Sequence, residues 1–169
     1  MEKHYLTPLF APQSIIVFAG DTEHPEGLTP QARALVASLQ SQTFTGTLRF
    51  LDIHSTGTLA DLAQARADLA IIALPPNDVS AALEIAGRIA CRAAVILSSG
   101  ISAEQAAALA KIAKREGVQL LGPNCLGLQR PQLQLNASAA GPLAQRGPLG
   151  SGGSSTWSSQ RPAFSHFAG

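Results

Sequence analysis

Short apolar runs alternate with segments of helical periodicity along this chain, and that alternation constrains the fold more than any other feature. The runs occupy residues 14–19, 48–53, 68–74, 93–97 and 118–121. Runs of this length suit strands that are buried on both faces, and the connections between them are too long for hairpins. We therefore predict the α/β class: a Rossmann-like, doubly wound parallel sheet of about five strands in a single domain.

Capping signals place two helices between these runs. Thr29 and Pro30 are typical of a helix start. Ser102 and Gln105 form a capping box, and Gly117 marks the end of the helix that they begin.

Two further helices are expected, one opening at residues 58–61 and one capped by Asn77 or Asp78. Helical spacing then predicts which side chains face the core. They are Leu35, Val36, Leu39, Val79, Leu83, Ala86, Ala90, Leu109, Ile112 and Ala113.

Composition excludes several functional classes. The 169 residues carry a formal net charge of +1 without a cluster of Lys or Arg, so neither nucleic acid nor an anionic membrane surface is an expected partner. Cys91 and Cys125 are too few for a disulfide framework and lack metal-ligand spacing, which favours a reducing cytoplasm and predicts no metal site. No apolar run approaches the ~20 residues of a membrane span, and the start of the chain lacks a signal-peptide core.

Open α/β sheets bind ligands beyond the carboxyl ends of their strands, so four loops carry the functional expectations. The loop at 20–27 has two glycines, which a phosphate cradle needs, but also Asp21, Glu23 and Glu26. A carboxylate about 6 Å from a phosphate costs about 3 kcal/mol at an effective dielectric of 20, whereas a helix dipole returns at most ~1 kcal/mol. A phosphate site and a plain surface turn are both open for this loop.

The other three loops differ in how much they suggest. The proline pair after Leu74 is a common strand end, or a rigid edge for an extended apolar ligand arm. Residues 98–101 are either a simple turn into the capped helix or a source of hydroxyl groups for a ligand. The Gly-Pro-Asn segment at 122–124 favours a functional role, because two glycines, a proline and an amide at a strand end indicate a backbone shape that is used.

Other polar residues do not form a recognisable catalytic set. The four histidines are scattered, without metal spacing or a nucleophile partner. Cys91 lies at a predicted helix end and Cys125 lacks a neighbouring base, so both are expected to be buried or spectator thiols rather than nucleophiles. Asp52, near the end of the second run, resembles the ribose-binding acid of NAD-binding folds, but no G-x-G-x-x-G precedes it, so NAD is a weaker alternative.

Several segments, taken in order, carry a family resemblance. They are Leu9-Phe10-Ala11-Pro12-Gln13-Ser14-Ile15, residues 68–72 with their proline edge, Ser98-Ser99-Gly100, Leu121-Gly122-Pro123-Asn124-Cys125-Leu126-Gly127-Leu128, and Leu135-Asn136-Ala137-Ser138. Together they resemble the N-terminal CoA-binding domain of NDP-forming acyl-CoA synthetases, the ADP-forming acetate–CoA ligases. The likeness is greatest to bacterial proteins that join such a synthetase to a Gcn5-related protein lysine acetyltransferase.

The resemblance implies that coenzyme A is bound as a substrate across the carboxyl ends of the strands. It assigns phosphate to Ala19 and Gly20, the pantetheine arm to Leu74 and Pro75, and the thiol end to the two remaining loops. The residues implied for the thiol end are Ser98, Ser99, Gly100, Ile101, Gly122, Pro123 and Asn124. Where the family has a basic residue for CoA phosphate after the second strand, His54 is the equivalent here.

The resemblance also implies what this chain would lack. Residues 1–147 are expected to form the CoA-binding domain and residues 148–169 a disordered, Gly/Ser-rich tail, which we expect to result from a reading-frame change or a truncated gene. The phosphohistidine, ATP-grasp and acetyltransferase parts of the family enzyme would then be missing partners. No catalytic residue is assigned, and the chain alone is predicted to be inactive. A stand-alone CoA-binding regulatory module is the alternative from a non-enzyme class.

Overall fold

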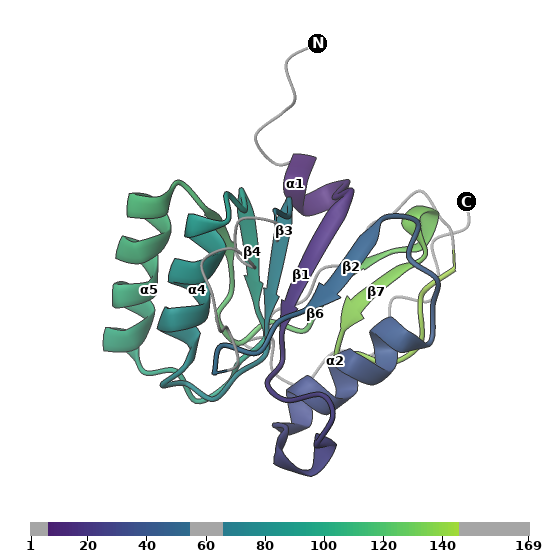
Figure 1. Ribbon diagram of the computed structural model, residues 1–169, viewed down its shortest axis with the longest axis horizontal. Coiled ribbons are helices and arrows are strands. Elements are labelled where there is room, and N and C mark those ends of the chain that lie inside the picture. Colours follow the sequence, from purple (N-terminus) through teal and green to yellow (C-terminus); the bar gives the residue numbers. More distant parts are fainter. Residues whose placement is uncertain (1–6, 55–65, 146–169) are drawn as a thin grey trace, which may run out of the picture.

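A five-stranded parallel sheet forms the centre of the computed structural model, which describes residues 7–54 and 66–145 (Figure 1). The strands are β1 (Ser14–Phe18), β2 (Thr47–Phe50), β3 (Leu69–Ile72), β4 (Ala93–Ile96) and β5 (Gln119–Leu121). Their order in the sheet is β2-β1-β3-β4-β5, and each neighbouring pair is parallel. The prediction of a Rossmann-like α/β fold is confirmed.

Burial explains why the apolar runs identify the strands. All four residues of β3 and all four of β4 are buried, because these central strands pack against both layers. The edge strands β2 and β5 leave residues exposed on their open sides. The two faces of the sheet form two separate apolar clusters, one containing Ile15, Val17 and Ile71 and the other Ile16, Phe18 and Ile72.

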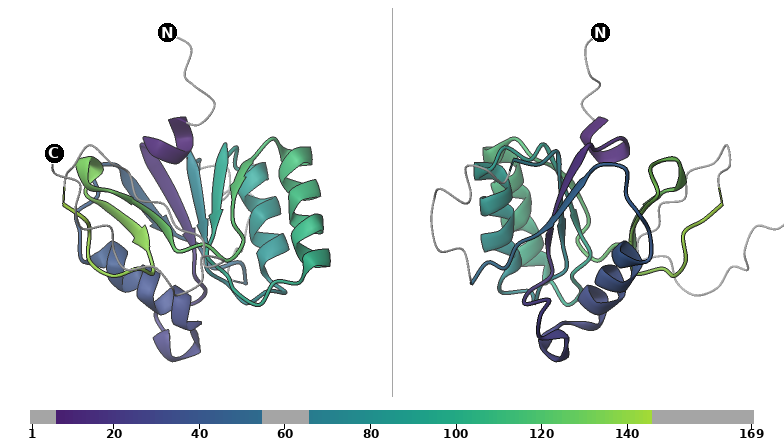
Figure 2. Two further views of the ribbon diagram at one scale, coloured as in Figure 1. Left: turned by 180° about the vertical axis from the view of Figure 1, so that it is seen from behind. Right: turned by 45° about the vertical axis from the view of Figure 1, so that its right-hand side comes forward.

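The helices cover the two faces unequally. Helices α4 (Val79–Arg88) and α5 (Ala103–Glu116) lie side by side on one face, and α2 (Pro30–Gln40) lies on the other (Figures 1 and 2). The short α1 (Thr7–Phe10) precedes β1, and the 3-10 turn η1 (Pro25–Gly27) precedes α2. No helix in the described ranges is long and apolar enough to cross a membrane.

The predicted helix starts at Thr29 and Ser102 and the stop at Gly117 are confirmed, whereas Asp78 precedes α4 without a side-chain capping bond. The hydroxyl of Thr29 accepts a hydrogen bond from the backbone N–H of Ala32, and the Ser102–Gln105 capping box is complete. Gly117 ends α5 with a left-handed φ of +70°. The predicted helix at 58–61, the domain boundary at 147 and the tail lie outside the described residues.

The predicted inward position of Ala90 is wrong. Helix α4 ends at Arg88, and Ala90 is exposed with φ +64°. Its N–H donates to Gly87 O (3.0 Å) and the N–H of Cys91 donates to Ala86 O (3.0 Å), the two bonds of a Schellman C-cap. The periodicity failed here because the helix stops without the glycine that usually marks such an end.

We expect Ala90→Gly to stabilise the protein by about 1 kcal/mol, because glycine carries no penalty for this left-handed conformation. Urea unfolding of the two proteins measures the difference. Ala110→Gly, at an exposed position inside α5, is the matched control and should destabilise by about 1 kcal/mol. A destabilised Ala90→Gly would contradict the assignment.

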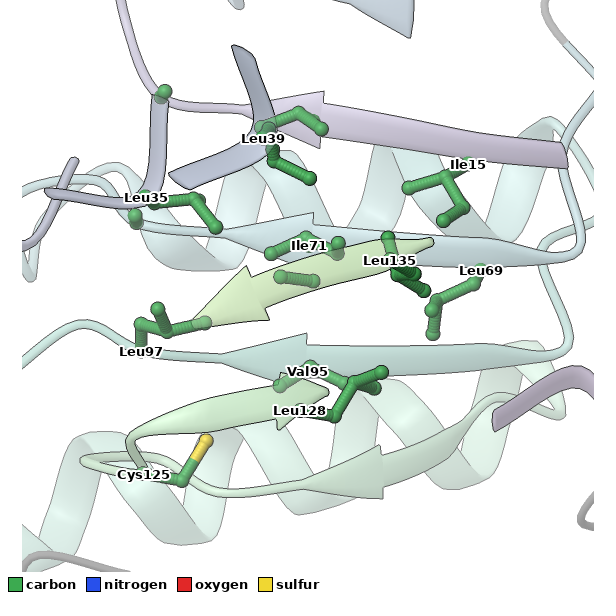
Figure 3. Close-up of a cluster of buried hydrophobic side chains, with 14 of the residues drawn as sticks. Ile15, Leu35, Leu39, Leu69, Ile71, Val95, Leu97, Cys125, Leu128 and Leu135 are labelled. Atoms are coloured by element: carbon green, nitrogen blue, oxygen red, sulfur yellow. The ribbon is translucent and has the colours of Figure 1, made fainter. Parts of the chain in front are cut away.

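A second, smaller sheet was not predicted. Strands β6 (Gly127–Arg130) and β7 (Leu135–Ser138) pair antiparallel around the 3-10 turn η2 (Pro131–Leu133). Leu128 and Leu135 join the same apolar cluster as α2 (Figure 3). The hairpin thus completes the cover that α2 begins on this face.

Candidate functional site at the carboxyl edge of the sheet

The four predicted binding loops meet at one edge of the sheet. They are residues 19–20 after β1, 74–75 after β3, 98–101 after β4 and 122–124 after β5, and we call this the carboxyl edge. From β1 the chain passes to β2 on one side and then to β3 on the other, so the order of the strands reverses between β1 and β3. Ligands of open α/β sheets bind at such a reversal.

Close approaches link the first three loops. A Cβ on Gly20 would lie 3.3 Å from Leu28 Cδ2 and 3.9 Å from Leu74 Cδ2, so this glycine lies against the end of β3. A Cβ on Gly100 would lie 3.7 Å from Pro76 Cγ. The loop after β1 therefore lies against the end of β3, and the proline pair after β3 lies against the loop after β4.

The fourth loop packs against the third. A Cβ on Gly122, which has φ +100°, would lie 2.5 Å from Ile96 O and 3.3 Å from Cys125 Sγ, so only glycine fits. The backbone N–H of Asn124 donates to Ser98 O at 3.1 Å. The unusual backbone of the Gly-Pro-Asn segment thus serves close packing against the end of β4.

The predicted site residues differ in their access to a ligand. Ala19, Leu74 and Ser98 are buried at 3%, 4% and 3% exposure and form the floor of the edge. The more accessible ones are Gly20, Pro75, Ser99, Gly100, Ile101, Gly122, Pro123 and Asn124, which are half-buried or exposed. Pro75, rather than Leu74, therefore offers the apolar surface at the end of β3.

The acidic residues of the first loop point to solvent. Asp21, Glu23 and Glu26 are all exposed. One carboxylate oxygen of Asp21 accepts the N–H of Glu23 (2.9 Å) and the other bonds His24 Nδ1 (2.6 Å). The bond to His24 lowers the pKa of Asp21, and the same bond raises the pKa of His24. The outward placement weakens the repulsion expected for a phosphate, and one of the three carboxylates is engaged with His24.

The N-terminus of α2 contributes few free donors to this edge. Pro30 has no N–H, Ala32 N–H donates to the Thr29 hydroxyl (3.1 Å), and Arg33 N–H donates to Thr29 O (3.0 Å). Gln31 is left as the residue of the first turn whose N–H is available to an anion. The N-terminus of α2 therefore offers a phosphate fewer free N–H donors than a glycine-rich loop followed by a helix would offer.

Side-chain bonds from α2 instead reach across the edge. Thr29 Oγ1 donates to Ala73 O at 3.3 Å, and Gln31 Nε2 donates to Ser99 Oγ at 2.8 Å. Gln31 was not among the predicted site residues, and no local sequence signal identifies it, because its partner is 68 residues away.

Asp52 and His54, which follow β2, already contact other groups of the chain. One carboxylate oxygen of Asp52 accepts the N–H of His54 at 3.0 Å. His54 Nε2 lies 3.8 Å from Asp78 Oδ2 at the start of α4. The residue that stands in for a basic phosphate ligand is thus paired with a carboxylate.

The cysteines are buried thiols, as predicted. Burial raises the pKa of Cys91 to about 12 and also raises that of Cys125. Cys125 Sγ donates to Ile96 O at 3.1 Å. Neither has the low pKa of a nucleophile. Within residues 7–54 and 66–145 no group of His, Cys, Asp and Glu could hold a metal ion, and His4 and His166 lie outside these ranges.

Comparison with known proteins shows what part of the chain is similar to. Residues 48–131 match a family model described as "CoA binding domain". "Acetate--CoA ligase [ADP-forming] I" of Archaeoglobus fulgidus is 36% identical over 88 residues, which is 48% of this chain and 13% of that protein. "Acetate--CoA ligase [ADP-forming]" of Methanocaldococcus jannaschii is 38% identical over 77 residues, 43% of this chain and 11% of that protein. The matched region is thus a small part of these relatives' length.

Solved structures support the fold. The dinucleotide-forming acetyl-coenzyme A synthetase 1 of Ca. Korarchaeum cryptofilum, in complex with phosphate and ADP, aligns with a TM-score of 0.67 and 24% identity over 79% of this chain and 30% of that chain. PH0766 from Pyrococcus horikoshii OT3 aligns with a TM-score of 0.65 and 24% identity over 79% and 33%.

Proposed function

Because residues 48–131 carry a CoA-binding domain homologous to the N-terminal region of ADP-forming acetate–CoA ligases, we propose that this chain binds coenzyme A along its carboxyl edge. The observation that carries the proposal is the coincidence of this match with the meeting of four loops at one edge. The matched residues contain the loops at 74–75, 98–101 and 122–124.

Each loop takes one part of the ligand. Phosphate groups lie at Ala19 and Gly20, close to the available N–H of Gln31. The pantetheine arm runs along Pro75 above the buried Leu74. The thiol end reaches residues 98–101 and 122–124. The backbone N–H groups of the glycine positions and the hydroxyls of Ser98 and Ser99 are neutral donors, which suit the amide of the arm next to its thiol end.

In the longer enzyme, this domain would present the CoA thiol while other parts activate the acyl acid. The relatives are many times longer than the matched region, so the phosphohistidine and ATP-grasp parts are the proposed missing partners. The chain alone then binds CoA without turnover. The order of the family segments, with L-G-P-N-C-L-G-L at 121–128, supports the type that also carries an acetyltransferase. The two free, buried cysteines support a reducing cytoplasm.

Titration calorimetry with CoA, NAD and ATP tests the proposal. We expect stoichiometric heat from CoA and weaker binding of ATP, and CoA should still bind when NAD is present in excess. Since the adenine nucleotide is common to all three ligands, discrimination among them requires contacts to the pantetheine arm. Binding of NAD alone would replace the CoA proposal by a dinucleotide function, and heat from none of the three would refute both.

A further inference from the structure

A single buried hydroxyl at the carboxyl edge has no partner. Of the buried side-chain nitrogen and oxygen atoms in the described part of the chain, only Ser98 Oγ makes no hydrogen bond. A buried polar group without a partner opposes folding, so native structures keep few of them. Where one persists at a ligand-binding edge, a bound ligand is a natural source of the missing bond.

The backbone around this hydroxyl is held from two directions. From α2, Gln31 Nε2 donates to Ser99 Oγ at 2.8 Å. From the loop after β5, the N–H of Asn124 donates to Ser98 O at 3.1 Å. These two bonds brace the end of β4, so Ser98 is fixed in place without its own hydroxyl being used.

The burial of Ser98 and the lack of charged groups bonded to it and its neighbours indicate which part of a ligand would fit there. The Ser98 hydroxyl is itself buried, whereas the next residues of the same turn, Ser99 and Gly100, are half-buried and exposed. No charged side chain is bonded to Ser98, Ser99 or Gln31 in the described structure. A hydroxyl both donates and accepts, and it therefore matches a neutral amide better than a phosphate.

We propose that Gln31 is a positioning residue: through Ser99 it holds the Ser98 hydroxyl where it bonds an amide of the pantetheine arm. This inference rests on the proposed function. It assigns to these residues the selection of pantetheine-bearing ligands over a bare adenine nucleotide. Gln31 touches the braced turn and acts on the ligand through it.

The test compares CoA with adenosine 3′,5′-bisphosphate, which lacks the arm, by calorimetry on the whole chain. We expect Ser98→Ala to weaken CoA binding roughly fivefold to tenfold and Gln31→Leu roughly threefold to fivefold. Both should leave the bisphosphate affinity unchanged. Gln40→Leu, an exposed change at the far end of α2, is the matched control and should bind both ligands normally.

Thermal unfolding separates this role from a structural one. Ser98→Ala removes an unpartnered hydroxyl, so its unfolding midpoint should equal or exceed that of the unsubstituted chain while its CoA affinity falls. Unchanged CoA affinity in both variants, or equal weakening of the two ligands, overturns the inference although CoA binding itself stands. If the unsubstituted chain binds no CoA, the proposed function fails and the inference fails with it.

Discussion

Gly127→Ala is expected to destabilise the domain by about 3 kcal/mol or more and to lower its unfolding midpoint by roughly 10 °C. Gly127 has φ +97°, a conformation that costs other residues about 1–2 kcal/mol. A Cβ here would also collide with the carbonyl oxygen of Ala137 on the paired strand. Because that atom is backbone, relief requires β6 and β7 to separate.

Loss of the hairpin would also expose part of the core. Leu135 is fully buried and Leu128 nearly so, both in the cluster that α2 covers (Figure 3). Gly117→Ala is the matched control, since Gly117 has φ +70° but nothing within 4 Å of its added Cβ. It should cost only about 1 kcal/mol. Equal urea-unfolding free energies for the two variants would show that the collision does not matter.

The main sheet was predictable because its strands carry their own signal. Central strands buried on both faces need apolar side chains at every position, and β3 and β4 show this directly. The caps at Thr29 and Ser102 are equally local, since each side chain bonds an N–H three residues away. The gathering of the four loops then follows from parallel strand direction alone.

The hairpin was not predictable in the same way. Side chains that join the core, such as Leu128 and Leu135, alternate with polar ones that bond one another on the opposite face of the hairpin. Gln129 Nε2 donates to Asn136 Oδ1 (3.0 Å) and to Pro142 O (3.0 Å). Asn136 is buried, and its partners Gln129, Ser138 and Gly141 reach it only once the hairpin and the turn after it have formed. From the sequence alone, short runs that contain such polar residues therefore predict a loop rather than a strand.

The detailed contacts of the site could not be predicted from the sequence for a related reason. The positions of the binding loops follow from topology, but the bond between Gln31 and Ser99 joins residues that no local pattern connects. The orientation of acidic side chains is equally invisible in a sequence. For the first loop, only the structure shows that the carboxylates face water.

Neutralising that loop should raise the affinity for CoA. We expect Glu23→Gln/Glu26→Gln to lower the dissociation constant of CoA roughly fivefold at about 10 mM salt, where the Debye length is ~30 Å. Both carboxylates are exposed beside the loop proposed to receive the phosphates. Asp21 is left unchanged, because its bonds to Glu23 N–H and His24 shape the loop.

Salt and position are the controls for this effect. At about 1 M salt the Debye length falls to ~3 Å, so the advantage of the double variant should disappear. The control Glu84→Gln/Glu116→Gln changes the net charge by the same amount as the first double variant. It removes the two partners of Arg115, which lie on α4 and α5, on the face of the sheet opposite α2. This control should leave CoA affinity nearly unchanged at either salt concentration. If both double variants change the affinity for CoA to the same extent, the phosphates of CoA do not lie at the first loop. The two variants have the same net charge and differ only in where the carboxylates are removed.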